Sequence, residues 1–212
     1  SLKSIFSNND IFGLNVTVPY KEQVVSQLDE LDEIAKKIGA VNTILPSYEN
    51  GKLSSLKGFN TDAFGFQQLI KPFLKTHHTN ALVLGSGGSS KAIIHVLNLY
   101  NIDYNIISRT QKADNPKFFT WEDINYYMVK YHPLIINTTP VGMYPNINQE
   151  FDFPYHFLSK NHLVIDLIYN PKLTNFLKKS SSQNAQVLNG YQMLVHQALK
   201  SWNIWNLSLN NN

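Results

Sequence analysis

Lys21 and Asp62 are two side chains in the first third of the sequence whose types suit proton transfer at a reacting oxygen. A lysine that can lose and regain a proton serves as a general acid or base at a carbinol–ketone centre. We expect Lys21 in the first turn of a helix, where the positive helix end disfavours an ammonium ion. Taken singly, the two are also typical of a solvated lysine and a helix-capping aspartate. The stronger hypothesis places both in one cleft with the amides of Asn42 and Asn60, which spacing alone does not establish.

A glycine-rich turn, GSGGSS at residues 85–90, follows the apolar run ALVL and opens a predicted helix. Gly85 suits the tight turn, Gly87 lets the backbone approach a pyrophosphate, and the helix N-terminus supplies free N–H donors. Ser90 stands where the third glycine or alanine of the usual pattern would be. The strand before the turn and the helix after it favour a dinucleotide site over an ordinary strand–helix loop.

Arg109 is the single arginine in a chain that otherwise uses lysine. It follows the second predicted strand, where NAD enzymes usually carry Asp or Glu to hold the ribose 2′-hydroxyl. The planar guanidinium instead suits a 2′-phosphate. This position therefore favours NADP over NAD, with Lys112 adding charge. A chance surface arginine is the alternative.

The first region of the chain predicts a small α/β unit. Residues 12–18 and 40–45 alternate like strands, and residues 49–52 are typical of a hairpin turn. A second helix begins near Asp62 and is capped by Asn60 or Thr61. Helical spacing from Lys21 onward is carried by Val24, Leu28, Leu31, Ala35 and Ile38, with Gly39 as the C-terminal cap.

The second region predicts a parallel sheet, because four apolar runs (81–84, 104–107, 134–136 and 163–168) do not alternate. A helix over residues 91–99 completes a βαβ unit. Residues 109–132 leave little room for a full helix and another strand, so we expect a trimmed sheet there. The last helix, residues 191–205, is expected to bury the face formed by Leu194, Ala198, Leu199 and Trp202.

Composition excludes several classes of function. The 212 residues include no cysteine, which removes disulfides and thiolate metal sites. A net charge of +3 with 16% charged residues is too weak to favour nucleic-acid or membrane binding. No leader or membrane span is recognisable, so we expect a cytoplasmic protein. Neither a metal-binding HExxH pair nor a GxSxG elbow occurs, and the aromatic side chains, including Tyr126, Tyr127, Trp202 and Trp205, are interpreted as core.

The chain resembles the shikimate dehydrogenase family through eight stretches in the family's order, which cover nearly its whole length. They are NVTVPYK (15–21), GAVNT (39–43), GFNTD (58–62), GSGG (85–88), SRT (108–110), INTTPVGM (136–143), DLIYNP (166–171) and GYQMLVHQ (190–197). The runs that end in Lys21 and Asp62 are very specific together.

The resemblance implies that NADPH gives a hydride to the ketone of 3-dehydroshikimate and makes shikimate reversibly. Lys21 matches the family's catalytic lysine, and Asp62 matches its partner at the reacting oxygen. The matching substrate positions are Thr17, Asn42, Asn60, Asp62, Tyr169 and Gln197. The pyrophosphate loop matches Gly85, Ser86, Gly87, Gly88 and Ser89, and the 2′-phosphate loop matches Ser108, Arg109, Thr110 and Lys112. Thr138, Leu167, Gly190 and Met193 match positions near the nicotinamide half.

The implied fold is two α/β domains around a cleft, the second a Rossmann-like doubly wound parallel sheet that binds NADP. Residues 1–76 plus 190–212 would form the discontinuous substrate domain, and residues 77–189 the NADP domain. We expect a monomer or homodimer that binds shikimate or 3-dehydroshikimate, with no metal, nucleic acid or membrane.

Two departures from the family pattern stand out. The family's N-terminal strand and its Ser-x-Ser-Pro turn, which holds the substrate carboxylate, do not precede Ser1. We therefore expect an incomplete chain whose substrate domain lacks part of its sheet. Gln192 stands where some members have glycine. Two alternatives stay open: a dehydrogenase that also uses quinate or NAD, and a nucleotide-binding relative without turnover.

Overall fold

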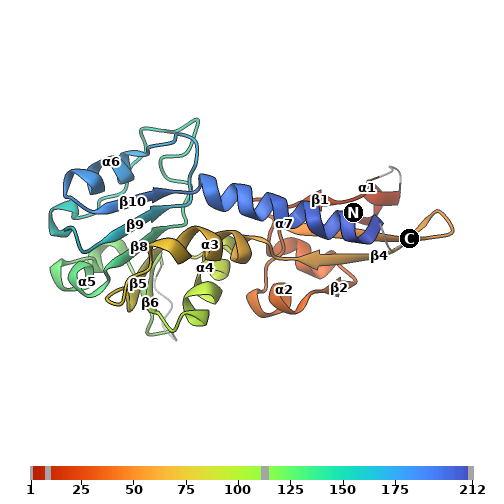
Figure 1. Ribbon diagram of the computed structural model, residues 1–212, viewed down its shortest axis with the longest axis horizontal. Helices are drawn as coiled ribbons and strands as arrows, with labels where there is room; N and C mark the ends of the chain where they lie inside the picture. Colours follow the sequence, from red (N-terminus) through yellow and green to blue (C-terminus); the bar gives the residue numbers. More distant parts are fainter. Residues whose placement is uncertain (1, 8–10, 111–114, 210–212) are drawn as a thin grey trace.

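The computed structural model describes residues 2–7, 11–110 and 115–209, which form two β-sheets joined by long helices (Figure 1). The larger sheet has six parallel strands in the order β10-β9-β8-β5-β6-β7. Its members are β5 (Asn80–Leu84), β6 (Asp103–Ile107), β7 (Phe118–Phe119), β8 (Leu134–Asn137), β9 (Leu163–Asp166) and β10 (Gln186–Asn189). Read from β7, this is the 3-2-1-4-5-6 order of doubly wound sheets, whose ligand crevice lies beyond the carboxyl ends of β5 and β8.

Both faces of the larger sheet are covered by helices. One face packs on α3 (Asp62–Ile70) and α4 (Gly88–Leu99), and the other packs on α5 (Tyr126–Tyr131) and α6 (Asn175–Ser182). Successive strand residues alternate between the two cores, and the side chains of residues 81–84 are fully buried. Burial on both faces is the reason these strands read as continuous apolar runs. The connections between the larger elements contain short 3₁₀ helices, namely η2 (Lys71–Phe73), η3 (Trp121–Asp123) and η4 (Tyr155–Phe157).

The smaller sheet has four strands in the order β1-β3-β4-β2. They are β1 (Leu14–Asn15), β2 (Glu30–Leu31), β3 (Thr43–Glu49) and β4 (Lys52–Phe59). The predicted hairpin turn is confirmed, because Asn50 and Gly51 join β3 to β4 with φ values of 52° and 73°. Around this sheet lie α1 (Leu2–Ser7), η1 (Gln23–Gln27) and α2 (Glu33–Ile38), whose apolar residues form a separate core.

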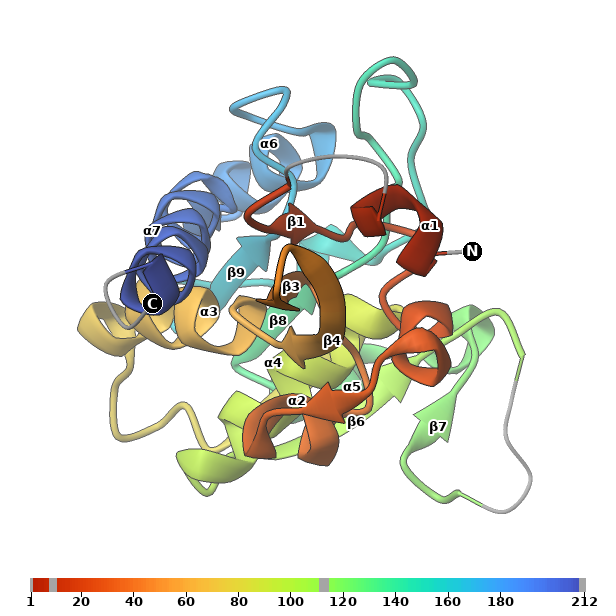
Figure 2. The ribbon, with the colours of Figure 1, turned by 90° about the vertical axis from the view of Figure 1, so that its right-hand side faces the viewer.

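The last helix, α7 (Tyr191–Leu209), connects the two sheets. It begins just after β10 and runs beside α3 toward the smaller sheet (Figures 1 and 2). A Cβ atom at Gly65 of α3 would lie 2.6 Å from the Met193 carbonyl oxygen, so glycine permits this close approach. Farther along α7, Trp205 Nε1 donates a hydrogen bond to the Ile44 carbonyl oxygen at 3.0 Å. A Cβ atom at Gly13 would lie 2.2 Å from Trp205 Nε1, so the end of α7 also packs closely on the segment before β1.

The predicted helix from Lys21 to Ile38 is wrong, because the structure divides it into η1, β2 and α2. The Asp29 carboxylate accepts a hydrogen bond from Leu56 N, and the Asp32 backbone N–H donates to the Gly58 carbonyl oxygen. These contacts pull residues 29–32 onto the edge of β4. Asp32 then caps α2 through a bond from Ala35 N, and Gly39 ends that helix at φ 69°, as predicted.

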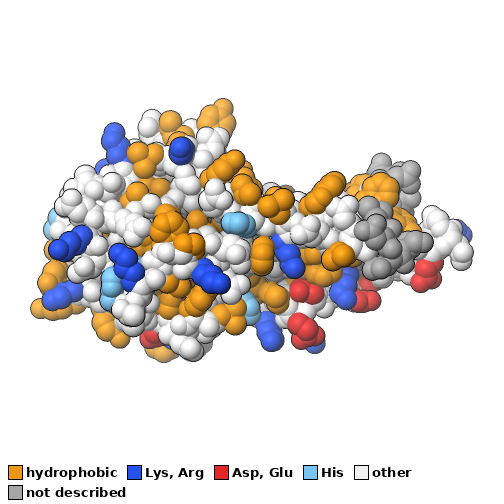
Figure 3. All heavy atoms as spheres, in the orientation of Figure 1, with side chains coloured by type: hydrophobic (Ala, Val, Ile, Leu, Met, Phe, Trp, Pro, Cys, Tyr) orange, Lys and Arg blue, Asp and Glu red, His pale blue; other side chains and the backbone are white. Residues whose placement is uncertain are grey.

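The predicted buried face of the last helix is also wrong. Leu199 and Trp202 are 55% and 61% exposed, and hydrophobic side chains show on the surface along α7 (Figure 3). Met193, Gln197 and Ser201 face inward instead, because the two polar members find hydrogen-bond partners there. Tyr127, at 78% exposure, is likewise not a core residue.

Other boundaries differ in smaller ways. The strand predicted over 12–18 is limited to β1, and a strand not predicted, β10, extends the larger sheet. Residues 115–131 hold only the two-residue β7, η3 and the six-residue α5. The strand and the helix are both short, as the limited length of this segment led us to expect. In the described part of the chain, no helix combines the length and apolar character that crossing a membrane requires.

Candidate active site

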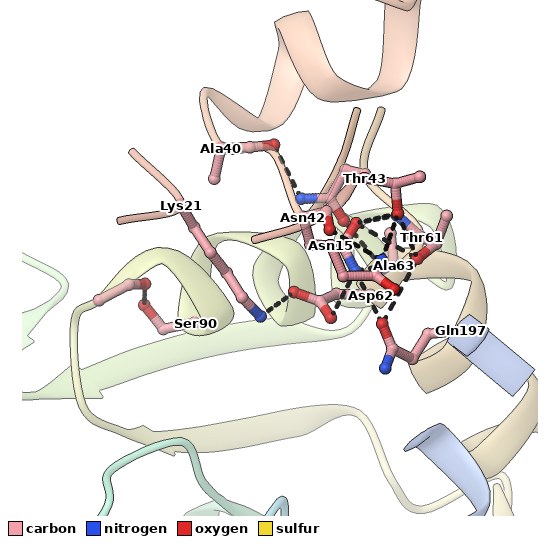
Figure 4. Close-up of polar contacts among 12 residues, drawn as sticks. Asn15, Lys21, Ala40, Asn42, Thr43, Thr61, Asp62, Ala63, Ser90 and Gln197 are labelled. Carbon is pink, nitrogen blue, oxygen red and sulfur yellow. Dashed lines mark hydrogen bonds and ion pairs between the residues drawn. The ribbon is translucent and has the colours of Figure 1, made fainter. Parts of the chain in front are cut away.

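Lys21 lies in the turn between β1 and η1, and its side chain extends to Asp62 at the first position of α3 (Figure 4). The Nζ atom is 2.5 Å from Asp62 Oδ2. The two side chains are only 11% and 5% exposed. The expected position of Lys21 in the first turn of a regular helix is not what the structure has. A buried carboxylate, not a helix end, is its main neighbour.

Asn42 fixes the orientation of the Asp62 carboxylate. Its Nδ2 donates to Asp62 Oδ1 at 3.1 Å, so each carboxylate oxygen has one donor. Its Oδ1 accepts the backbone N–H of Thr61 at 2.7 Å. Asn42 is 2% exposed, and it precedes β3, so a rigid strand supports the amide. The resulting pair is a buried, oriented ammonium–carboxylate contact of the kind that can hold a proton near a reacting oxygen.

Gln197 reaches the same group from α7. Its Oε1 accepts a hydrogen bond from Asn42 Nδ2 at 2.8 Å. Figure 4 shows its amide nitrogen directed away from Asn42. Because Gln197 and Asn42 are 155 positions apart in the chain, α7 completes a site that the first region begins.

Behind this group lies a cluster of hydroxyls that sequence reasoning missed. Ser201 Oγ lies 2.7 Å from Thr43 Oγ1 and 3.1 Å from Thr61 Oγ1. Asn15 Nδ2 donates to the same Ser201 oxygen at 3.2 Å. Ser201 stands four residues after Gln197, so it shares that helix face. This spacing was the available signal, and it was hidden by the assumption that the apolar face is the buried one.

Three other predicted substrate residues stand apart from the pair. Asn60 is buried and supports the local fold, since its Nδ2 donates to the Ala40 carbonyl and its Oδ1 caps Ala63 N. Thr17 and Tyr169 are exposed, and among the described contacts no hydrogen bond joins either side chain to Lys21 or Asp62. The structure therefore brings together Lys21, Asp62, Asn42 and Gln197 but not the whole predicted set.

The glycine-rich turn occupies the crevice end of β5, as predicted. Gly85 adopts φ 107°, and its N–H donates to the Ile107 carbonyl oxygen at the end of β6. A Cβ atom at Gly87 would meet nothing within 4 Å, so packing within the protein does not require glycine there. Gly87 is also the N-cap of α4 and has no side chain to bond the first N–H groups of that helix. Open space beside free donors fits a pyrophosphate.

The segment after β6 lies next to this turn. Ser108 is buried and its hydroxyl donates to the Thr110 carbonyl oxygen, whereas Arg109 and Thr110 are exposed. Arg109 therefore stands at the crevice edge of the strand that neighbours β5, where a 2′-phosphate would be held. Lys112 lies outside the described residues.

The residues matched to the nicotinamide half meet at the ends of β8 and β9. Thr138 Oγ1 donates to the Leu84 carbonyl oxygen at 2.8 Å. A Cβ atom at Gly190 would lie 1.9 Å from the Leu167 carbonyl oxygen, so only glycine fits there. Met193 is 7% exposed and packs mainly into the core between α3 and the sheet.

The Lys21–Asp62 pair and the glycine-rich turn are neighbours. The Lys21 Cβ atom would lie 3.1 Å from a Cβ atom at Gly88, and Glu22 forms an ion pair with Lys91 at 2.5 Å. On the face shown in Figure 3, basic side chains are spread over the larger sheet, and acidic side chains gather mainly near the smaller one. Within the described ranges, no cluster of three or more metal-binding side chains occurs.

Comparisons with known proteins identify relatives of this chain. The family described as "Shikimate dehydrogenase substrate binding domain" matches residues 1–44. A shikimate dehydrogenase (NADP(+)) of Methanosphaera stadtmanae is 38% identical over 92% of this chain and 72% of its own length.

Solved structures give the same result. The shikimate 5-dehydrogenase of Thermus thermophilus in complex with NADP(H) and shikimate is similar, with TM-score 0.78 and 29% identity over 96% of this chain and 76% of that one. A quinate dehydrogenase from Corynebacterium glutamicum in complex with NAD has TM-score 0.80 and 25% identity, with the same two shares covered.

Proposed function

This chain belongs to the shikimate dehydrogenase family, and we propose that Lys21 and Asp62 are the residues that move the proton in its reaction. The activity is that of an NADP-dependent shikimate dehydrogenase, an oxidoreductase of the shikimate pathway of aromatic amino-acid biosynthesis. It reduces 3-dehydroshikimate to shikimate reversibly. The observation that carries the assignment of roles is the 2.5 Å contact between Lys21 Nζ and Asp62 Oδ2.

The chemistry divides between a hydride and a proton. When bound, NADPH supplies the hydride that reaches the carbonyl carbon. The Lys21–Asp62 pair supplies the proton to the carbonyl oxygen, and in the reverse direction it accepts the hydroxyl proton. Burial of both side chains strengthens their interaction and keeps water from competing for the proton. Asn42 holds the carboxylate so that the proton has one defined path.

Substrate binding is proposed for the polar groups around this pair. Gln197 uses its oxygen to bond Asn42, which leaves its amide nitrogen for a substrate hydroxyl or carboxylate. Thr17 and Tyr169 are exposed side chains that a substrate would order. Asn60 is assigned a supporting role, because both ends of its amide are already bonded within the protein.

Cofactor binding is proposed for the crevice ends of β5, β6, β8 and β9. Residues 85–89 would hold the pyrophosphate and residues 108–110 the 2′-phosphate, with Arg109 as the charged donor. Thr138, Leu167 and Gly190 would border the nicotinamide half, and Met193 would present only its edge. The observation that supports this fit is the open space at Gly87 beside the first turn of α4.

The division into domains is part of the proposal. Residues 1–76 with 190–212 would form the substrate domain, and residues 77–189 the NADP domain. This division is supported by the strands, which form two separate sheets. A cytoplasmic location and a monomeric or homodimeric state stay predictions of the sequence.

A second candidate is a dehydrogenase that takes quinate or NAD, favoured by the similarity to the quinate dehydrogenase that binds NAD. Arg109 favours NADP, because its charge would be of little use to NAD. The purified protein mixed with shikimate and NADP⁺ should form NADPH, followed by its absorbance. Faster turnover with NAD⁺ or with quinate would favour the second candidate, and absence of turnover with every pair would contradict both.

A further inference from the structure

Asp166, the last residue of β9, is a fully buried carboxylate, and within the described part of the chain its hydrogen-bond donors are all uncharged. Its Oδ1 accepts bonds from Asn137 Nδ2 at 3.0 Å and from Ile168 N at 3.1 Å. Its Oδ2 accepts the Thr174 hydroxyl at 2.6 Å. Burial raises the pKa of Asp166 to about 6. A buried anion held only by neutral donors is costly, so its retention points to a role other than stability.

The partners of Asp166 control two loops at the crevice. Asn137 uses its Oδ1 to bond Thr139 N at 2.9 Å and the Thr139 hydroxyl at 2.7 Å. The Asn137 carbonyl oxygen accepts Leu167 N at 3.0 Å. The loops after β8 and after β9 are therefore joined at their first residues. Thr174 also caps α6 through Leu177 N, which anchors the far end of the second loop.

Three hydrogen-bond donors converge on the Asp166 side chain, and a carboxylate can accept bonds from them at both of its oxygens. An amide of the same shape would present an N–H₂ group to the Thr174 hydroxyl, which already accepts Leu177 N. The exchange would leave one hydroxyl proton without an acceptor inside the protein. The loops would then lose the single arrangement that the carboxylate imposes.

We propose that Asp166 is a positioning residue, which through Asn137 and Thr174 holds Thr138 and Leu167 in place for the nicotinamide half of the cofactor. The proposal rests on the proposed function for the assignment of those two residues. Among the described residues, its hydrogen-bond donors are Asn137, Ile168 and Thr174, none of which is proposed for the pyrophosphate or the 2′-phosphate. Asp166 should therefore matter for one half of the cofactor only.

The test compares two ligands in direct binding measurements on the purified protein. One is NADP⁺, and the other is adenosine 2′,5′-bisphosphate, which carries the 2′-phosphate half but no nicotinamide. We expect Asp166→Asn to weaken NADP⁺ by about tenfold, the scale of one hydrogen bond to a charged group, and to change the bisphosphate by less than about twofold. Thr174→Val should act in the same direction, and Thr174→Ser should restore binding.

Asn125→Ala is the matched control, because it removes a similar helix cap at α5, which packs on the same face of the sheet as α6. It should leave both affinities unchanged. Equal weakening of the two ligands, or unchanged NADP⁺ affinity in both Asp166→Asn and Thr174→Val, would overturn the proposal. Since binding needs no turnover, absence of activity in the unsubstituted protein would instead contradict the proposed function.

Discussion

Lys21 Nζ lies 2.5 Å from Asp62 Oδ2, although 41 positions separate the two residues in the chain. The contact is made where the turn before η1 meets the start of α3, and Asn42 donates to the other carboxylate oxygen. Removal of either side chain would leave the other as an unpaired, largely buried group. The pair is therefore fixed in position before any ligand binds.

Substitution of Asp62 by asparagine should abolish most of the turnover. Asp62→Asn keeps the shape of the side chain but removes the charge that holds the Lys21 ammonium. We expect kcat for shikimate oxidation to fall by about 10²- to 10⁴-fold, the usual contribution of a positioned acid–base group. Steady-state rates with saturating NADP⁺ check this. Ser201→Ala, which alters the hydroxyl cluster behind the pair, is the control and should reduce kcat much less; similar losses in both variants would contradict a specific role for Asp62.

Arg109 should decide which cofactor the protein prefers. Its exposed guanidinium stands at the crevice end of β6, beside the glycine-rich turn. Arg109→Ala should weaken NADP⁺ by about tenfold or more, since bonds to charged groups contribute on the order of 1.5–3 kcal/mol. The affinity for NAD⁺, which lacks the 2′-phosphate, should change little. Dissociation constants for both cofactors measure the difference, and equal weakening would mean that the side chain does not touch the phosphate.

Substitution by alanine should affect cofactor binding at Gly87 and the free energy of unfolding at Gly190. A Cβ atom at Gly87 meets nothing within 4 Å, whereas one at Gly190 would lie 1.9 Å from the Leu167 carbonyl oxygen. Gly87→Ala should leave the free energy of unfolding within about 0.5 kcal/mol of the unsubstituted protein and weaken NADP⁺. Gly190→Ala should lower the free energy of unfolding by about 1–3 kcal/mol, because the Leu167 backbone must move. Chemical denaturation and cofactor titration separate the two; unchanged NADP⁺ affinity in Gly87→Ala would remove that turn from the cofactor site.

His78 should make the protein sensitive to acid. Burial, with His77, Lys75 and His162 nearby, lowers the pKa of His78 to about 4. Between pH 6.5 and 4 the unfolded chain therefore binds more protons at this residue than the folded protein. The free energy of unfolding should fall as the pH falls through that window.

His78→Asn offers an oxygen that can accept the Lys75 N–H, as the imidazole Nδ1 does, and removes the titration. Denaturation at several pH values should show a shallower slope for the variant between pH 6.5 and 4 and parallel curves between pH 7 and 9. Asp166 has a raised pKa and acts in the opposite direction, but it is common to both proteins and cancels in the difference. Parallel curves across the acid window would contradict the assignment to His78.

The nucleotide-binding half was predictable from sequence, because burial on both faces leaves continuous apolar runs and β5 is followed directly by the glycine-rich turn. The smaller half was harder. Asp29 and Asp32 interrupt the expected helix through bonds to Leu56 and Gly58, which lie 26 or more positions later. Spacing within one segment cannot reveal such partners.

The candidate residues of the site could be predicted from the sequence, but the hydroxyl cluster behind them could not. Lys21, Asp62 and Asn42 were recognisable as candidates, and the structure joins them. Ser201 was hidden because hydrophobicity assigned the wrong face of α7 to the interior. A buried polar residue needs hydrogen-bond partners, and those of Ser201 come from β1, from β3 and from the N-cap of α3.

The direct test of the central claim is Lys21→Ala, measured for both turnover and binding. The claim is that the buried ammonium moves the proton at the reacting oxygen. We predict that kcat for shikimate with NADP⁺ falls by about 10³-fold or more while the dissociation constant of shikimate changes by less than about threefold. A variant that keeps kcat within about tenfold of the unsubstituted protein would contradict the role of Lys21 in the chemistry.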